Sequence, residues 1–299
     1  MRWVSRGMLA RAKVGAAVVL VAAAGLVSSG PVATADRNRP ALALGDSVGF
    51  GFITQAGFQY VNPSNFVGFP ERFGQELRLD VTNASCPGAT SGGLLSSATR
   101  DNGCLFFRAN SPLHVAYAGL QIDYATAFVR HHPDTRLISL IVGANDLFLL
   151  QKDCLGSIPC IQAGLPALLG QIGQNLDATY TALRAAGFRG VLVGVTYYSL
   201  NYADPLTTGV IQALDSVIAQ HTLAAGGVVA DGFAAFKAAA STTFAGGDSC
   251  KAGLLNATPD PTRQFSCDVH PSQSGQALLA RAVADAYLAA RNEGRDSGS

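Results

Sequence analysis

The stretch ALALGDSVGFGF, residues 41–52, decides between two folds. Its Gly45, Ser47 and Gly49 spell G-x-S-x-G, the string of the nucleophile elbow in α/β-hydrolases. That elbow follows a central strand, and a loop earlier in the chain completes its oxyanion hole. Ser47 instead follows the first strand-like run after residue 35, where no earlier loop of that kind is predicted. We therefore interpret Gly45-Asp46-Ser47 as a motif at the carboxyl end of a first strand.

Short apolar runs alternate with longer helical patterns through the rest of the chain. The predicted strands are residues 41–44, 79–83, 137–142, 191–195 and 228–230, and the clearest predicted helices are residues 113–130, 161–186, 208–225 and 272–291. This alternation predicts an α/β fold, a three-layer α/β/α sandwich with a five-stranded parallel sheet. No internal repeat or interdomain linker interrupts residues 36–299, so we expect a single domain there.

Polar groups follow the predicted strands and precede the last predicted helix. They are Gly45-Asp46-Ser47, Cys86-Pro87-Gly88, Gly143-Ala144-Asn145-Asp146 and Asp268-Val269-His270-Pro271. Because ligand sites in such sheets lie at the carboxyl ends of the strands, these groups are expected to meet. Any one of them alone could be a helix cap or a turn. All four in order form a strong signal.

In this order the four groups resemble the motifs of the SGNH or GDSL family of serine esterases and lipases. The resemblance covers nearly all of residues 36–299 and implies a flavodoxin-like sandwich that needs no metal or cofactor. It implies that Ser47 is the nucleophile and His270 the base. It also implies an oxyanion hole formed by the backbone N–H groups of Ser47 and Gly88 and the side-chain amide of Asn145.

These residue types suit the hydrolysis of an ester. A serine hydroxyl is a weak nucleophile at neutral pH, so a histidine must take its proton and return a proton to the leaving alcohol. Many relatives carry an aspartate three residues before the histidine, but Cys267 occupies that position and Asp268 lies two before His270. We expect Asp268 to orient His270, with a backbone carbonyl near Ser266 or Cys267 as the alternative.

The chain contains six cysteines, which indicates an oxidising compartment. They form three neighbouring pairs along the sequence: Cys86 and Cys104, Cys154 and Cys160, and Cys250 and Cys267. Six cysteines allow about fifteen pairings, so the sequence alone proves none of them. Secreted members of the family that the chain resembles usually carry three local disulfides, which favours pairing between neighbours over a metal site.

The first 35 residues have the pattern of a secretory signal peptide. Basic residues precede the apolar residues 14–27, and Ala33-Thr34-Ala35 matches an A-x-A cleavage site. This apolar run is shorter than the roughly twenty residues that span a bilayer. We expect residues 1–35 to be removed, leaving a secreted, extracellular protein without stable membrane insertion.

Composition limits the partners of this protein. Its formal net charge is +1 and its sequence shows no basic cluster, which argues against binding to nucleic acid. The expected partner is a small-molecule or lipid ester, and we expect the chain to act as a monomer.

Aromatic residues are dense between the first two motifs. We predict that Phe50, Phe52 and Phe58, with Phe148 just after the third motif, line an acyl pocket, because ligand clefts are mostly apolar. This pattern favours acyl lipids or other apolar esters as substrates. The alternatives are a carbohydrate O-deacetylase of the same fold and a non-catalytic exported binding protein.

Overall fold

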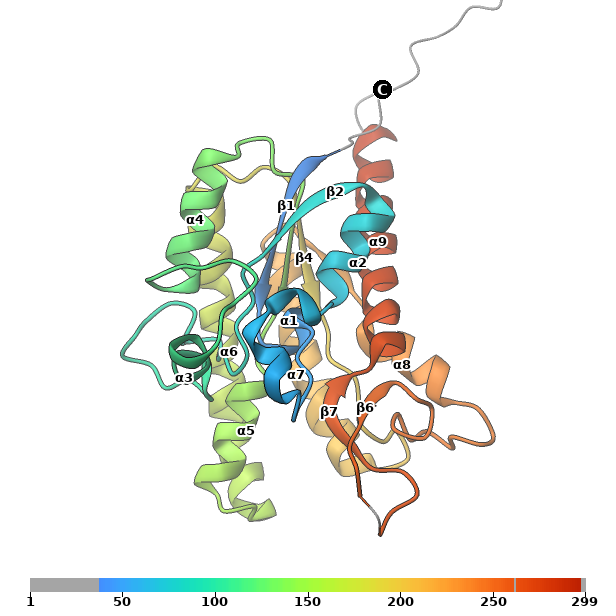
Figure 1. Cartoon of the computed structure of the whole chain (residues 1–299). Coiled ribbons are helices and arrows are strands. Elements are labelled where there is room, and N and C mark those ends of the chain that lie inside the picture. Colours follow the sequence, from blue (N-terminus) through green and yellow to red (C-terminus); the bar gives the residue numbers. More distant parts are fainter. Residues whose placement is uncertain (1–37, 261, 297–299) are drawn as a thin grey trace, which may run out of the picture. The chain divides into compact units, whose positions relative to one another are not determined.

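The structure, a computed structural model, describes residues 38–260 and 262–296. At its centre lies a five-stranded parallel sheet in the order β2-β1-β3-β4-β5 (Figure 1). The strands are β1 (Arg39–Gly45), β2 (Leu79–Asn83), β3 (Leu137–Ile141), β4 (Val191–Val195) and β5 (Val228–Ala230). This is the strand order of flavodoxin-like doubly wound sheets. The predicted fold class is confirmed.

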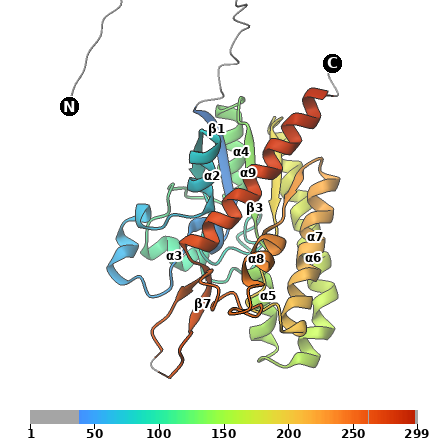
Figure 2. The ribbon, with the colours of Figure 1, turned by 90° about the vertical axis from the view of Figure 1, so that its right-hand side faces the viewer.

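Helices cover both faces of the sheet (Figures 1 and 2). They are α1 (Ser47–Phe50), α2 (Phe69–Leu77), α3 (Cys104–Asn110), α4 (Gln121–His131), α5 (Ala144–Asp153), α6 (Ile158–Ala185), α7 (Pro205–Ala224), α8 (Gly232–Ala240) and α9 (Gln273–Asp296), with 3-10 turns at Gly57–Val61 and Pro63–Asn65. One layer contains α2, α8 and α9, and α9 packs on β4 and β5. The other layer contains α4, α6 and α7.

The core forms because the strands are apolar on both faces and the helices on one. All residues of β3, with the sequence LISLI, are buried. On α9, apolar residues recur at every fourth position and are buried where the helix packs on the sheet; they are Leu279, Val283 and Tyr287. The layers therefore close on a continuous apolar interior.

The five predicted strands are confirmed, but the predicted helix over residues 113–130 is wrong in its first part. Helix α4 begins only at Gln121. Arg108 donates to the carbonyls of Tyr117 and Gly119 and lies 4.4 Å from the centre of the Tyr117 ring. These contacts hold residues 113–120 in an irregular path, so the helical pattern in the sequence is overridden. Helices α1, α2, α3, α5 and α8 lie outside the four predicted helix ranges.

A small antiparallel pair, β6 (Leu255–Ala257) and β7 (Cys267–Pro271), lies against the beginning of α9.

Three disulfides join Cys86 to Cys104, Cys154 to Cys160 and Cys250 to Cys267, with Cα–Cα distances of 5.5, 5.6 and 5.8 Å. These are the neighbouring pairs that the sequence favours. The third disulfide fastens β7 to the segment that follows α8.

The predicted signal peptide, residues 1–35, lies outside the described residues. In the part of the chain that the structure describes, no helix combines the length and the apolar character needed to cross a membrane.

A buried glutamine controls the carboxyl end of β1. Gln121 is 4% exposed, and its Oε1 accepts the N–H of Gly45 at 2.7 Å while its Nε2 donates to the Gly45 carbonyl at 3.0 Å. Gly45 has a φ of +138°, and a Cβ atom there would lie 2.1 Å from the carbonyl oxygen of Ile141, so glycine is required. This amide pairing sets the backbone immediately before Ser47.

We expect Gln121→Leu to lower the free energy of unfolding by about 1–3 kcal/mol, because it leaves the buried Gly45 N–H without an acceptor. Urea denaturation measures this change. The matched control is Gln171→Leu on an exposed position of α6, which should change stability by less than about 0.5 kcal/mol. Equal stabilities of the two variants would contradict the role given to Gln121.

Candidate active site

Ser47 is the first residue of α1, and only Asp46 separates it from the end of β1. Asp46 caps this short helix, because its Oδ1 accepts the N–H of Val48 at 2.9 Å. The helix ends at Gly51, which has a left-handed φ of 77° and lies so close to Gly68 that a Cβ atom would be 2.5 Å from the Gly68 nitrogen. This tight turn places Ser47 at the carboxyl edge of the sheet, where it lines a cavity.

His270 approaches Ser47 from β7, at the other end of the described chain. Its Nε2 lies 3.0 Å from the Ser47 Oγ. In the tautomer with a proton on Nδ1, Nε2 is the acceptor and the serine hydroxyl is the donor. This contact can pass the serine proton to the imidazole.

Asp268 meets the other nitrogen of the same ring. Its Oδ2 lies 3.3 Å from His270 Nδ1, and its Oδ1 accepts the backbone N–H of His270 at 2.8 Å. Both residues belong to β7, and residues two apart in a strand point to the same face. Asp268 lies two residues before His270, not three as in many relatives, but its carboxylate therefore still reaches the imidazole.

Sequence reasoning missed Thr54, which contacts both of these groups. Its backbone N–H donates to Asp268 Oδ2 at 3.2 Å, and its hydroxyl lies 3.4 Å from His270 Nδ1. Partial burial opposes ionisation of Asp268, but the hydrogen bonds from His270 and Thr54 outweigh it and lower the pKa of the Asp268 carboxyl. Phe52 packs edge-on against the imidazole with ring centres 5.0 Å apart. The His270 ring is thus held on two sides.

Asn145 lies in the first turn of α5 and lines the same cavity. Its Nδ2 donates to the Ala89 carbonyl at 3.0 Å and lies 3.5 Å from Asp46 Oδ2, so the second contact is the weaker one. Its Oδ1 accepts from Asn102 Nδ2 at 2.8 Å, and Asn102 Oδ1 in turn accepts from Lys152 Nζ at 2.6 Å. These contacts fix which way the amide faces and leave its weakly bound hydrogen for a ligand oxygen.

Gly88 lies in the turn after β2 with a φ of 87°. A Cβ atom there would be 2.7 Å from the Asn102 carbonyl oxygen, so the packing of the following loop also requires glycine. In residues 38–260 and 262–296, neither the Gly88 N–H nor the Ser47 N–H has a protein acceptor. Both groups are therefore free to donate a hydrogen bond to a ligand oxygen.

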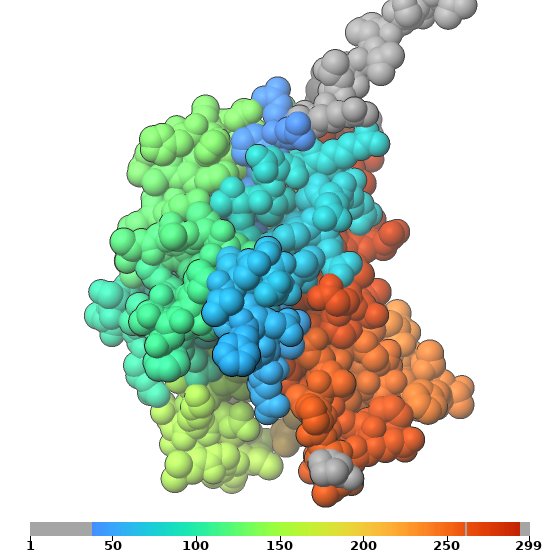
Figure 3. All heavy atoms as spheres, viewed as in Figure 1, coloured from blue at the N-terminus to red at the C-terminus, as the bar shows by residue number. Residues whose placement is uncertain are grey.

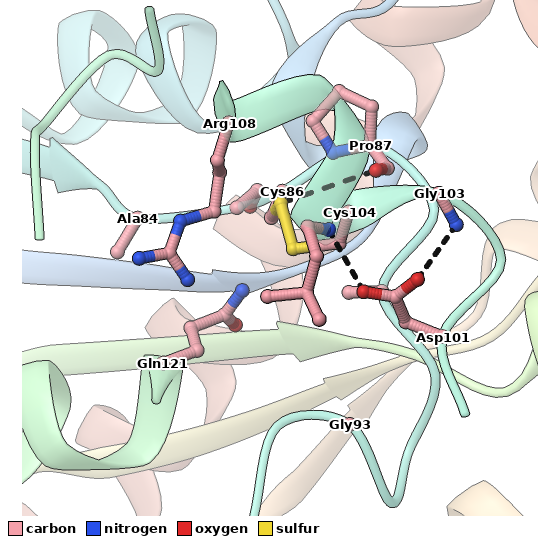
Figure 4. The surroundings of a disulfide bond; sticks show 12 residues. Ala84, Cys86, Pro87, Gly93, Asp101, Gly103, Cys104, Arg108 and Gln121 are labelled. Carbon is pink, nitrogen blue, oxygen red and sulfur yellow. Dashed lines mark hydrogen bonds between the residues drawn. A yellow bond between two sulfur atoms is a disulfide. The ribbon is translucent and has the colours of Figure 1, made fainter. Parts of the chain in front are cut away.

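The Cys86–Cys104 disulfide ties this turn to the start of α3 (Figure 4). The Asp101 carboxylate accepts the N–H of Gly103 at 2.9 Å, and the Gly88 carbonyl accepts the N–H of Asn102 at 2.8 Å. The loop that carries Gly88 is thus fixed by one covalent bond and by hydrogen bonds on both sides.

The cavity at Ser47 has a volume of about 490 Å³ and is mostly apolar. Its wall is built by α5, α6 and the beginning of α7, and His270 and Asn145 border it beside Ser47. The main apolar residues of the wall are Leu147, Phe148, Ile158, Ile161, Leu165, Leu206, Val210 and Ile211. This volume is in the range of sites that bind small organic ligands.

A model of the GDSL-like lipase/acylhydrolase family matches residues 43–278, which include all four motifs and the residues around Ser47. The chain belongs to this GDSL-like family. A comparison with curated proteins finds no match.

Solved structures of the same fold include a phospholipase and a lipase. Phospholipase A1 from Streptomyces albidoflavus NA297 is 20% identical with a TM-score of 0.51, covering 86% of this chain and 99% of that one. A lipase from a goat rumen metagenome is 14% identical with a TM-score of 0.53, covering 84% of this chain and 98% of that one. At these identities the likeness establishes the fold of this GDSL-like protein.

The aromatic residues predicted for the acyl pocket lie in different places. Phe148 lines the cavity, but Phe50 is fully buried in the core, where its ring packs against Phe66. Phe58 is 96% exposed in a 3-10 turn, and Phe52 contacts the imidazole and does not line the cavity. The wall comes from α5–α7 instead. The sequence does contain a signal for this wall. Residues 154–176 carry more apolar residues than a helix needs for the one face that packs on the core.

Two buried carboxyl groups, those of Asp46 and Asp215, are joined through Tyr197 next to Ser47. Tyr197 donates its hydroxyl to Asp46 Oδ2 at 2.5 Å, and its backbone N–H donates to Asp215 Oδ1 at 2.7 Å. Burial raises the pKa of Asp46 to about 6, although hydrogen bonds from Tyr197 and Val48 oppose this. Burial likewise raises the pKa of Asp215 to about 8, and its Oδ2 has no partner among the described residues. Asp215 is therefore expected to be mainly protonated at neutral pH.

The raised pKa of Asp215 predicts a pH-dependent stability. From its ordinary pKa of 3.8 up to about 8, the folded protein holds a proton that the unfolded chain releases. The free energy of unfolding should therefore fall as the pH rises through this range. In urea denaturation from pH 5 to 8, Asp215→Asn should show a shallower decline than the parent.

Asp285→Asn, at an exposed position of α9, is the control and should keep the slope of the parent. Parallel slopes for Asp215→Asn and the parent would show that Asp215 does not titrate in this way.

Proposed function

We propose that this GDSL-like protein is a serine esterase that cleaves carboxylic esters of apolar acyl groups through an acyl-enzyme on Ser47. The observation that carries this proposal is the contact of the Ser47 hydroxyl with His270, at the end of an apolar cavity. In this proposal Ser47, His270 and Asp268 are the catalytic residues. The oxyanion donors are the backbone N–H groups of Ser47 and Gly88 and the amide of Asn145.

In the first half of the reaction, Ser47 Oγ attacks the ester carbonyl carbon while its proton moves to His270 Nε2. The carbonyl oxygen gains negative charge and accepts hydrogen bonds from the three donors. Asp268 faces the imidazolium that forms and stabilises it. As the intermediate collapses, His270 gives its proton to the leaving alcohol, and the acyl group stays on Ser47.

In the second half, a water molecule attacks the acyl carbon and gives a proton to His270 Nε2. The same three donors stabilise the second tetrahedral intermediate. Its collapse returns the proton to Ser47 Oγ and releases the carboxylic acid.

The shape and polarity of the cavity support an apolar acyl group as the part of the substrate that it binds. Its wall is mainly aliphatic, and a sugar ring would leave its hydroxyl groups without partners against such a wall. Two structures of the same fold come from a phospholipase and a lipase. For these reasons we place an acyl ester above an acetylated sugar.

We further propose that the enzyme acts outside the cell as a single catalytic domain after removal of residues 1–35. The pattern of basic and apolar residues at the N-terminus supports this, and so do the three disulfides, which persist in oxidising compartments.

The central test is the loss of activity in two variants. Ser47→Ala should abolish hydrolysis of p-nitrophenyl butyrate and labelling by a fluorophosphonate, because no nucleophile remains. Asp268→Asn should lower kcat by about 10²- to 10⁴-fold, because the imidazole loses the group that orients it. The control Asp260→Asn changes a partly exposed carboxylate near the tip of the same hairpin and should keep full activity. Turnover that survives in purified Ser47→Ala would overturn the proposal.

A second test addresses the acyl group. Ile161→Trp should fill part of the cavity and lower kcat/KM for a decanoyl ester by about tenfold or more, with little effect on the acetyl ester. The matched control is Ala163→Trp, at an exposed position of the same helix that does not line the cavity. Equal losses on both esters would show that the acyl group binds elsewhere.

A further inference from the structure

A long uncharged segment forms one wall of the cavity and part of the protein surface. Residues 154–176 contain no Asp, Glu, Lys, Arg or His, although many of them are exposed. They run from the end of α5 to Leu176 in α6, and the beginning of α6 lies past the carboxyl ends of the strands (Figures 1 and 2). An exposed helix of a soluble protein normally carries charges on its outer face. The lack of charge here is a property of the surface and not of the core.

Leu155 is the most unusual residue of this segment. Its side chain is 94% exposed, and its φ of 49° lies in the left-handed region that favours glycine or asparagine. It follows α5 at the position where a helix commonly ends in such a residue. A leucine there adds backbone strain and buries no apolar surface in the described structure, so stability does not explain it.

Further exposed apolar residues lie around the same opening. Ile158 is 48% exposed, Leu200 is 41% exposed and Leu206 is 42% exposed, and all three also line the cavity. Ile158 belongs to α6, whereas Leu200 and Leu206 lie before and within α7. The apolar lining of the cavity thus continues onto the surface at both of these elements. In the space-filling view, the yellow-green residues of α5 and early α6 form an outer end of the molecule (Figure 3).

The corner between α5 and α6, residues 154–161, is held in one shape. The Cys154–Cys160 disulfide closes it, and the Ser157 N–H donates to the Cys154 carbonyl at 2.9 Å. Leu155 and Ile158 are therefore presented outward without a large loss of conformational freedom on binding.

We propose that this α5–α6 corner docks the enzyme on an uncharged lipid surface, with Leu155 and Ile158 inserted and the cavity opening toward the lipid. An uncharged, apolar surface complements a neutral lipid–water interface, and its continuity with the cavity gives an ester a path from the lipid to Ser47. The inference rests on the proposed function, because docking on lipid serves to bring an ester to Ser47. The binding itself is measurable without catalysis.

The test uses Ser47→Ala protein and phosphatidylcholine vesicles in a flotation assay, so that no product forms. We expect the protein to float with the vesicles. Adding Leu155→Asn should reduce the fraction that floats by about tenfold, because one large inserted side chain is lost. Asparagine tolerates the left-handed backbone, so this variant should be at least as stable as its parent in urea. Loss of binding without loss of stability is the decisive result.

The control is Leu223→Asn, which removes an exposed leucine, 59% exposed, at the far end of α7 and should leave binding unchanged. All variants keep the N-terminus of their parent, so the apolar residues 14–27 contribute equally to each. The inference is overturned if Leu155→Asn binds as its parent does, or if neither protein floats. It is also overturned if Leu155→Asn leaves vesicle binding unchanged and lowers only the molecular mass measured by analytical ultracentrifugation. That result would make the corner a contact between two copies of the protein.

A kinetic measurement separates this inference from the proposed function. With Ser47 intact, Leu155→Asn should hydrolyse monomeric p-nitrophenyl butyrate at the parental rate and lose activity only on esters presented in vesicles. If the parent hydrolyses neither substrate while Ser47→Ala still floats, the proposed function fails and the docking surface stands.

Discussion

The hydrogen bond between Ser47 and His270 joins positions 223 residues apart, and much of the fold is needed to form it. Ser47 is positioned by β1, an inner strand of the sheet, whereas His270 lies on β7, outside that sheet. A hydroxyl–imidazole bond tolerates only a few tenths of an ångström in length. The Cys250–Cys267 disulfide and the packing of β7 on α9 supply this precision from one side, and the Gln121–Gly45 pairing supplies it from the other.

Buried polar groups are concentrated next to Ser47, at a cost to stability. Burial raises the pKa values of Asp46 and Asp215 to about 6 and about 8, which means that the folded state disfavours their charged forms. Both carboxyl groups accept a hydrogen bond from Tyr197. Asp46 also caps α1 and lies near the side-chain amide of Asn145. A core built only for stability would contain apolar residues here. The network instead holds the backbone and the amide around Ser47 in one arrangement.

The two halves of helix α6 serve different purposes: one packs in the core, and the other contributes to the function that we propose. Its second half buries Ile172, Leu176 and Leu183 in the core, while its first half leaves apolar residues exposed beside the cavity. The two halves have similar hydrophobic composition but different surroundings. Apolar surface that is not needed for the core is available for a ligand or a lipid surface.

The sequence by itself determined the strands, the parallel sheet and the order of the four motifs, because alternating apolar runs and strand-end residues are local features. The cysteine pairing was only favoured by the resemblance to secreted relatives, and the tertiary structure shows the three neighbouring pairs bonded. Only the tertiary structure decided which aromatic residues face the cavity: Phe50 enters the core, Phe58 faces solvent and Phe148 lines the wall. Likewise it decided that Asp268 reaches the imidazole and that Thr54 joins it. Side-chain direction depends on how distant segments pack, and a local pattern carries no information about that packing.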